Sequence, residues 1–462
     1  MKEKIEAGKT ELNKEYLNRK GTKIMHELTK LIKEDMKPAL GVTEPGAIAF
    51  AVAKAKTYTG GELVSVKVSM NSGMYKNAFT CGIPGSDVSG AIYAAAFGYV
   101  AGDPEKGMES LAGMTGSDNE EGKRLVDEGK IKTEMTGITS RIFIRAEVVT
   151  DKDQAIVTIR DSHTNITCIK VNGEVVFGEE EAPDGEQGAI ETGPIGPVID
   201  GYKDLTIHSY KIEELVKYVD SVDPDEIAFI GEAFGMNLAL LHKGLESGDA
   251  VFAAHLLEQN GGREISEDEQ TTAQLLCSGA IESRVIGIDA PAMSITGSGA
   301  HGIIATMPLY AVCKAGGYSD EMLLRATALS YLICMYIKEY SGKLSAFCGC
   351  GIAAGTGMAC ALCYMKGGDI QTIIRTMNNM AASITGMICD GGNQGCTMKG
   401  VAATDAAFRS VDFALSGVCI DSVHSIIGET PELTMRNMGL IAAPGMVGTE
   451  KTIVEIFEDK NH

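Results

Sequence analysis

The sequence contains no tryptophan, and aromatic residues make up only 6% of its 462 residues. Basic residues are also scarce, because 41 Lys and Arg stand against 62 Asp and Glu, which gives a net charge of −21. A field of this sign repels phosphate backbones and anionic lipid, so nucleic acid is not an expected partner. With few large aromatic side chains and 55 glycines, the core is expected to pack small residues closely.

An apolar signal region is also missing from the first residues, which read MKEKIEAGKTELNKEYLNRK. The 12 cysteines are therefore expected to be reduced thiols of a cytoplasmic protein. Residues 344–365 carry no charge and are long enough to cross a bilayer, but they are rich in Gly, Ala, Cys, Ser and Thr, which insert poorly. We expect this segment to be a helix buried inside the protein, with no membrane partner.

The pattern of apolar residues changes near the middle of the chain. In the first half, alternation predicts strands within residues 62–73, 141–149 and 154–178, with Asn172-Gly173 as a two-residue hairpin turn. From Leu205 onward, helical periodicity predominates and almost no strand is predicted. The fold class is therefore α+β, with an N-terminal mixed α/β part that contains an antiparallel sheet and an all-helical C-terminal part.

The length predicts two or three domains, or one large core. A polar, glycine-rich and acidic segment, residues 177–201, is the natural boundary. Near the start, an amphipathic helix is expected to be broken by Pro38. We therefore expect N-terminal helices over residues 1–40, a mixed α/β domain with the substrate loops over residues 41–200 and an all-helical domain over residues 201–462.

The cysteines gather toward the end of the chain. Cys348 and Cys350 flank one glycine, and Cys389 and Cys396 bracket a segment that holds three more glycines. A helix over that segment would separate the two sulfurs by about 10 Å, too far for one small cluster, so a loop is favoured. Three thiolates, one from the Cys-Gly-Cys turn and two from the loop, suit a 4Fe-4S cluster with one open iron. Zinc stays open as the alternative ion, because the spacing alone does not separate the two.

Residues 294–302, SITGSGAHG, combine hydroxyl groups and glycines ahead of an apolar run. At the start of a helix, such a segment offers hydroxyls, backbone N–H groups and the positive end of the helix dipole to a carboxylate or a phosphate. The candidate substrate-binding residues in it are Ser294, Thr296, Gly297, Ser298 and Gly299. His301 is a candidate acid or base, with a merely hydrogen-bonded histidine as the alternative.

Residues 71–77, NSGMYKN, directly follow a predicted strand and are expected to form a polar loop. In that loop, Lys76 and the backbone amides would grip a small anionic substrate, together with Asn71, Ser72 and Asn77. An exposed lysine in a turn is the alternative interpretation of Lys76.

Five segments, taken in order, resemble the cysteine desulfidase and UPF0597 family, which is itself related to the iron–sulfur L-serine dehydratase alpha domains. They read GVTEPGAIAFAVAKA, YKNAFTCGIPGS, SITGSGAHGIIATMP, LSAFCGCGIAAGTG and GMICDGGNQGCTMKG. The resemblance implies an oxygen-sensitive 4Fe-4S cluster, whose open iron binds the leaving group of a small amino acid during α,β-elimination. It implies Cys389, Cys396 and Cys350 as ligands, with Cys348 in place of Cys350 as the alternative. Cysteine would give pyruvate, ammonia and sulfide, and L-serine is the alternative substrate.

The chain departs from the family pattern at two positions. The family usually reads Gly-Cys-Thr-Glu-Pro at the first motif, with the cysteine as the proposed proton acceptor, whereas this chain has Val42. Ala300 stands where the family tends to carry asparagine. Either Lys76, His301 or Glu44 is then the base, or the reaction has changed and the protein is an altered lyase, a binding protein or a sensor. The small-residue helices are suited to packing within one chain or between the subunits of a homo-oligomer.

Overall fold

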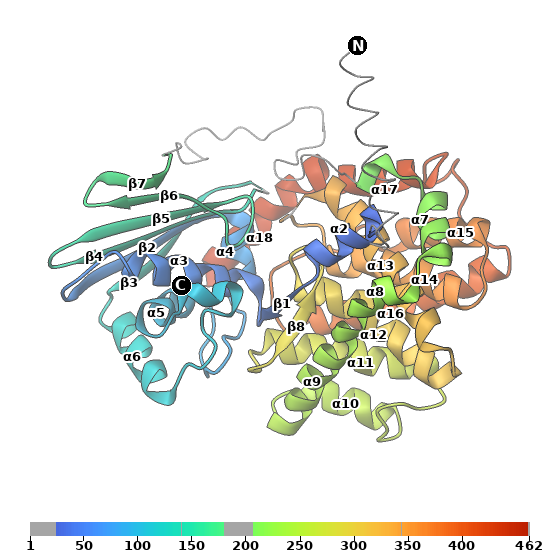
Figure 1. The fold of residues 1–462 in the computed structure, drawn as a ribbon, viewed down its shortest axis with the longest axis horizontal. Helices are drawn as coiled ribbons and strands as arrows, with labels where there is room; N and C mark the ends of the chain where they lie inside the picture. Colours follow the sequence, from blue (N-terminus) through green and yellow to red (C-terminus); the bar gives the residue numbers. More distant parts are fainter. Residues whose placement is uncertain (1–24, 140, 180–206, 343, 461–462) are drawn as a thin grey trace, which may run out of the picture.

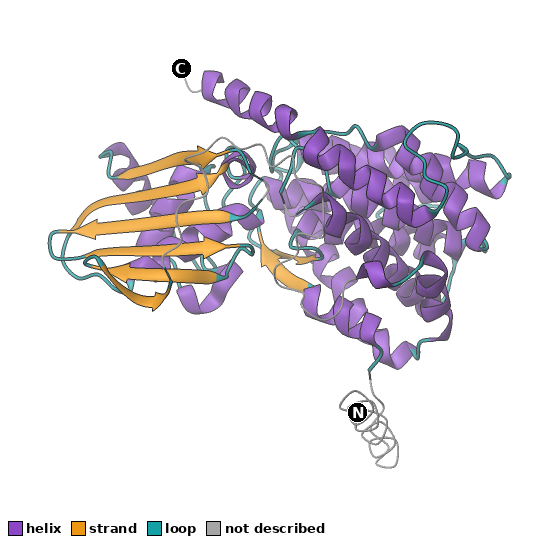
Figure 2. Cartoon of the chain, turned by 90° about the horizontal axis from the view of Figure 1, so that it is seen from above, coloured by secondary structure: helices purple, strands orange, loops and turns teal. Residues whose placement is uncertain are grey.

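The computed structural model describes residues 25–139, 141–179, 207–342 and 344–460. Two parts lie side by side in Figure 1, a β-sheet with helices on one face and a larger assembly of helices. Figure 2, seen from above, shows the strands of the larger sheet as one layer at one end of the molecule. The predicted α+β class is confirmed. Residues 1–24 of the predicted N-terminal helices and residues 180–201 of the predicted boundary lie outside the described residues.

The main sheet has six strands in the order β3-β2-β4-β5-β6-β7. Neighbouring strands are antiparallel except β2 and β3, which are parallel. The strands are β2 (Leu63–Asn71), β3 (Ile131–Gly137), β4 (Phe143–Thr150), β5 (Gln154–Arg160), β6 (Ile166–Val171) and β7 (Glu174–Gly178). The predicted hairpin turn is confirmed, because Val171 pairs with Glu174 and both turn residues have positive φ. Strand β3 was not predicted, since its side chains are largely polar and only Ile131 is buried.

Helices α3 (Thr43–Lys56) and α5 (Ala91–Val100) pack on the sheet, and α6 (Gly116–Asp127) packs on α5. The contact between α3 and α5 is made by very small residues. A Cβ atom on Gly98 would lie 2.6 Å from the Cα atom of Ala49, so only glycine permits this approach. The expectation that small residues replace a large aromatic core therefore holds at this contact.

The helical part surrounds a buried centre formed mainly by α11, α12, α13, α14 and α16. Its longer elements are α7 (Ile212–Ser221), α9 (Glu232–Ser247), α10 (Val251–Gln259), α11 (Glu269–Val285), α12 (Gly299–Gly316), α13 (Asp320–Ser341), α14 (Gly355–Met365), α15 (Ile370–Ile384), α16 (Gly395–Leu415), α17 (Pro431–Leu440) and α18 (Val447–Lys460). Short helical turns are α8 (Pro224–Ile227), η1 (Pro104–Glu109), η2 (Ile207–Ser209), η3 (Ala228–Gly231), η4 (Cys350–Ala354) and η5 (Ile441–Gly445).

The uncharged segment 344–365 is buried as expected, but it is not one helix. It begins without helical structure, makes one π-helical turn at η4 and continues as α14. Among the described residues, no helix combines the length and the apolarity that crossing a membrane requires.

The two parts are connected at both ends of the described chain. Helix α2 (Glu27–Asp35) packs on α13, and β1 (Lys37–Leu40) pairs antiparallel with β8 (Pro291–Ser294). Residues 37–40 are thus a strand and not the end of a helix, because Pro38 lacks an N–H and favours an extended residue before it. The helical half therefore contains a strand, β8, which is too short for alternation to reveal. At the other end, α18 returns to contact α4 (Ser72–Asn77) of the sheet part.

Two glycines of α14 give a matched test of this packing. A Cβ atom on Gly357 would lie 2.3 Å from the carbonyl oxygen of Ser330 in α13, whereas one on Gly355 would meet nothing closer than 3.4 Å. We expect Gly357→Ala to destabilise the fold by about 1–3 kcal/mol through overpacking. Gly355→Ala should be neutral or stabilising by up to about 1 kcal/mol. Urea unfolding measures both, and equal effects would contradict the close contact of α13 and α14.

Candidate functional site

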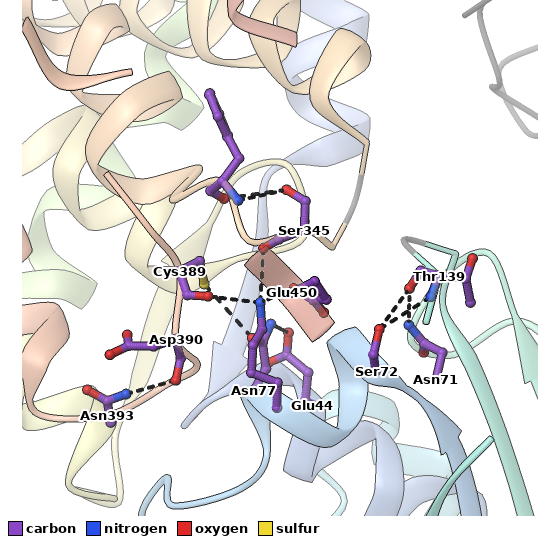
Figure 3. A network of polar contacts seen from close by, with 12 residues as sticks. Glu44, Asn71, Ser72, Asn77, Thr139, Ser345, Cys389, Asp390, Asn393 and Glu450 are labelled. Atoms are coloured by element: carbon purple, nitrogen blue, oxygen red, sulfur yellow. Dashed lines mark hydrogen bonds and ion pairs between the residues drawn. The ribbon is translucent and has the colours of Figure 1, made fainter. Parts of the chain in front are cut away.

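The five sequence motifs meet where the sheet part contacts the helical part. Residues 345–350 run beside residues 387–396, which we call the cysteine loop: Phe347 bridges Ile388, and the N–H of Cys389 donates to the carbonyl oxygen of Ala346. The N–H of Gly392 donates to the carbonyl oxygen of Asn77 at the end of α4. Figure 3 shows Glu44 and Asn77 of the sheet part facing Cys389, Ser345 and Glu450.

The cysteine loop has the loop conformation that its glycines predict, and α16 begins only at Gly395. Gly391 has a φ of 102°, and a Cβ atom there would lie 2.4 Å from the carbonyl oxygen of Lys76. Gly392 also lies close to Val42, whose Cγ1 would be 2.8 Å from a Cβ atom at that position. Glycine is therefore needed for the loop to lie against α4 and the start of α3.

The four cysteines of the turn and the loop affect one another's ionisation. A hydrogen bond from the Cys350 thiol lowers the pKa of Cys348 to about 6 although burial opposes this, and the Lys399 ammonium contributes in the same direction. The same bond, burial and the other thiolates raise the pKa of Cys350 well above its usual value. Burial raises the pKa values of Cys389 and Cys396, and the charge of Cys348 adds to this effect. Four sulfurs from two distant segments thus share one small region.

The donor set fits a thiolate-bound metal centre in its chemistry, with a lysine beside it to offset negative charge. Within the described residues, however, no three His, Cys, Asp or Glu side chains converge on one point as metal ligands. The Cys396 thiol donates to the carbonyl oxygen of Gly391 at 3.3 Å, and the Cys389 thiol to Oδ1 of Asn77 at 3.9 Å. A metal centre held by this set would replace these two thiol hydrogen bonds with bonds from the sulfurs to the metal.

Lys76 is completely buried in α4. Its Nζ atom donates to Oε2 of Glu450 at 2.7 Å, to the carbonyl oxygen of Cys389 at 2.9 Å and to that of Ser345 at 3.0 Å. Burial lowers the pKa of Lys76, but the charges of Cys389 and Glu450 more than offset this and hold it above its usual value. The protonated side chain therefore links α4 to the cysteine loop and to α18, and it is not an exposed lysine in a turn.

The segment expected to form a polar loop is the short helix α4, so Asn71 and Ser72 lie at its start. Nδ2 of Asn71 donates to the carbonyl oxygen of Thr139, and its Oδ1 accepts from the N–H of Phe143. The Ser72 hydroxyl also bonds the backbone of Thr139. These two residues lie apart from Cys389 in Figure 3, and their hydrogen bonds stabilise contacts within the sheet part. Of the three predicted polar side chains, Asn77 is the one at the cysteine loop.

Glu44 lies in the first turn of α3, fully buried, and accepts hydrogen bonds from Asn77 and Thr43. Burial would raise the pKa of Glu44, but His163, whose Nε2 is 3.8 Å away, Asn77 and the charge of Arg284 lower it to about 2. Glu44 is thus a carboxylate at neutral pH and a weak proton acceptor.

The segment 294–302 leads from β8 into α12, as expected for an anion loop. Thr296 and Gly297 have φ values of 52° and 75°, which makes the tight turn, and Ser298 is the N-cap without a capping hydrogen bond from its side chain. The Ser294 hydroxyl donates to the carbonyl oxygen of Lys37 in β1, so it is used within the fold.

His301, in the first turn of α12, is buried with one ring edge against the Cys-Gly-Cys turn. The Thr296 hydroxyl donates to the carbonyl oxygen of Ile295 and bonds Nδ1 of His301. Because that hydroxyl hydrogen is already used, we assign the ring hydrogen to Nδ1, which leaves a lone pair on Nε2. Nε2 would lie 2.7 Å from a Cβ atom on Gly349, so it faces the turn between the two cysteines.

The charge state of His301 follows from its surroundings. Burial lowers its pKa well below the usual value, and the charges of Lys338 and Arg284 lower it further, against the opposing charge of Glu44. The imidazole is therefore neutral at pH 7. Of the three candidate bases, His301 is the one that combines a free lone pair with a position at the cysteines.

Three residues at the site were not identified from the sequence. Lys399 could have been, because it follows Cys396 by three residues at the start of a helix, which puts both side chains on one face. It forms an ion pair with Asp390 of the cysteine loop. His163, in the turn between β5 and β6, and Arg284, at the end of α11, carry no local signal, because the fold alone brings them to Glu44.

Comparison with known proteins identifies the family of this chain. A family model described as serine dehydratase alpha chain matches residues 105–455. A UPF0597 protein of Clostridium botulinum (strain Langeland) is 38% identical over 430 residues, which cover 93% of this chain and 98% of that protein. UPF0597 proteins of Caldanaerobacter subterraneus and Clostridium tetani are 35% and 31% identical, covering 94% and 96% of this chain and 98% and 100% of theirs. The chain therefore belongs to the serine dehydratase alpha chain family, together with these UPF0597 proteins, as its motifs predicted.

The buried carboxylate of Glu44 makes stability depend on pH. Because its pKa is about 2 in the fold against a usual 4.5, it stabilises the folded state above pH 4.5 and loses this effect as the pH falls toward 2. Between about pH 6 and about pH 3, it accounts for about 2 kcal/mol of the decrease in unfolding free energy. We expect Glu44→Gln to have a lower free energy of unfolding than the natural chain at pH 6. Between about pH 6 and about pH 3, its free energy of unfolding should decrease by about 2 kcal/mol less than that of the natural chain. Urea unfolding measures this, with Glu246→Gln, an exposed position, as the control. A decrease as large as that of the natural chain would contradict the burial and pairing of Glu44.

Proposed function

We propose that the protein is an iron–sulfur-dependent lyase that carries out α,β-elimination on a small amino acid, with L-cysteine as the first substrate to test and L-serine as the next. The observation that carries the proposal is that the neutral His301 imidazole faces the turn between Cys348 and Cys350, beside the cysteine loop. This arrangement supports the proposal, because four thiols that suit a metal centre and an imidazole that could act as the base lie within one buried region. Family membership supports the reaction class.

Cys389, Cys396 and Cys350 would hold a 4Fe-4S cluster, with Cys348 as the alternative third ligand. When bound, such a cluster supplies a Lewis-acidic iron that polarises the bond to the leaving group. The N–H groups of the cysteine loop lie close to these sulfurs, and the Lys399 ammonium lowers the pKa values of three of the four thiols. These two contributions favour the thiolate forms that a metal centre requires, and they oppose burial, which raises the pKa values of Cys389 and Cys396.

His301 is proposed as the base that removes the α-proton. Its Nε2 lone pair is available at pH 7, and Thr296 holds the opposite side of the ring, which fixes the orientation of the imidazole. Cys81, in the second motif, is a thiol that could replace the cysteine the family usually carries at position 42, but we do not propose it as the base, because burial raises its pKa far above neutral pH. Lys76 and Glu44 act in this proposal as positioning residues, since one is a fully bonded ammonium and the other a very weak base.

The valine at position 42 favours a second candidate function, a binding or sensor protein that keeps the centre without turnover. Val42 is buried against Gly392 of the cysteine loop and offers no proton acceptor. An anaerobic preparation that holds the metal centre but converts neither cysteine nor serine would favour this second function.

Metal analysis of anaerobically purified protein tests the cofactor. We expect about four irons and four acid-labile sulfides per chain, with brown colour that is lost in air. Cys389→Ser should lose most of the iron, whereas Cys360→Ser, which changes a buried thiol that donates to the carbonyl oxygen of Ile373, should retain it. Separate serine variants of Cys348 and Cys350 identify the third ligand. Colourless, iron-free protein would overturn the proposal, and zinc that persists in air would assign a zinc site instead.

A histidine variant tests the base. His301→Gln should keep the iron content but lower the rate of pyruvate formation by about 10²- to 10⁴-fold, because a positioned general base contributes that much. His242→Gln, at an exposed histidine paired with Glu264, is the control and should be unaffected. Normal turnover by His301→Gln would exclude His301 as the base.

A further inference from the structure

The strongest unexplained feature of the described chain is the guanidinium of Arg284, in the last turn of α11. The residue is 4% exposed, and its Nε atom has no hydrogen-bond partner. No hydrogen bond or ion pair from its side chain is found to any residue that the structure describes. An arginine stays charged in proteins, and a buried charge without a partner is strongly unfavourable. The arrangement therefore calls for an anion that comes from outside the chain.

Arg284 points at the start of α12. Its Nε atom would lie 2.7 Å from a Cβ atom on Gly299, the first residue of this 18-residue helix. The absence of a side chain at Gly299 lets the guanidinium reach the first turn. The N-cap residue Ser298 leaves the first N–H groups of α12 without a side-chain cap. A helix N-terminus and a buried guanidinium thus direct positive charge to the same place.

Glu44 lies in the same region but forms no ion pair with Arg284. The charge of Arg284 lowers the pKa values of Glu44 and His301, so all three lie in one region. The oxygens of Glu44, however, accept hydrogen bonds from Asn77 and Thr43. The region therefore holds a cation and an anion that are not paired with each other, beside a neutral imidazole.

We propose that Arg284 binds the α-carboxylate of a zwitterionic amino acid against the first turn of α12. This inference rests on the proposed function and specifies its substrate class. A guanidinium matches a carboxylate with two parallel hydrogen bonds, and the separate Glu44 carboxylate favours a ligand that also carries an ammonium group. A phosphate dianion suits the region less well, because the Glu44 carboxylate would repel it.

Calorimetric titration of the anaerobically purified full chain with L-alanine tests this inference. L-Alanine has no β-leaving group, so it reports binding whether or not the elimination occurs. We expect the natural chain to bind L-alanine and to bind L-alaninamide, which lacks the carboxylate, at least about 10-fold more weakly. Arg284→Met should weaken L-alanine binding by about 10- to 100-fold, and Arg284→Lys should weaken it less. Arg375→Met, at an arginine on α15 that bonds Thr372, is the control and should bind normally.

A second variant tests the inference independently of whether Arg284→Met folds. Gly299→Ala keeps the guanidinium but places a methyl group against it, and should also weaken L-alanine binding. Unchanged binding by folded Arg284→Met, no binding by the natural chain, or Arg284-dependent binding of inorganic phosphate in preference to L-alanine would each overturn the inference. Absence of iron or of elimination, with L-alanine binding that still depends on Arg284, would overturn the proposed function and leave this inference standing.

Discussion

The buried ammonium of Lys76 is the interaction on which the junction depends. Its three acceptors come from three different segments: the cysteine loop, the segment before the Cys-Gly-Cys turn, and α18. Burying a charge is unfavourable unless all its hydrogen-bonding capacity is used, and here every N–H of the ammonium has an acceptor. The position of the Cys389 backbone, and with it the separation of the sulfurs, therefore depends on a lysine that takes no part in the proposed proton transfer.

Although the chain has a strongly negative net charge, several of its cationic side chains gather at this one region. Lys76, Lys399 and Arg284 reach it from α4, α16 and α11, and each influences the ionisation of at least one group of the site. Two of the cations are paired, with Glu450 and Asp390, and one is not. Paired cations hold the thiols in place and favour their ionisation, whereas the unpaired one remains for a ligand. Burial keeps the His301 imidazole neutral by lowering its pKa, and the charges of Lys338 and Arg284 lower that pKa further.

Much of this arrangement could be predicted from the sequence, and the remainder depends on contacts between distant residues. Local sequence patterns were sufficient to predict the Asn172-Gly173 hairpin and the glycine loop between Cys389 and Cys396. Both depend on backbone conformations that neighbouring residues favour. The state of Lys76 was not predictable, because its partner Glu450 is 374 residues away in sequence. The position of Arg284 at the site was not predictable for the same reason. Asn71 and Ser72 looked like ligand-binding residues, but they bond Thr139, which a local pattern does not show.

The central claim is that sulfurs from the Cys-Gly-Cys turn and from the cysteine loop gather around one metal centre at the junction of the two parts. The most direct measurement is a crystal structure of anaerobically prepared protein with anomalous scattering recorded at the iron edge. The account predicts a single compact iron peak between the Cys348 to Cys350 turn and the Cys389 to Cys396 loop, facing the Nε2 edge of His301. Iron-loaded protein with its peak anywhere else, or with those sulfurs pointing away from it, would contradict the account.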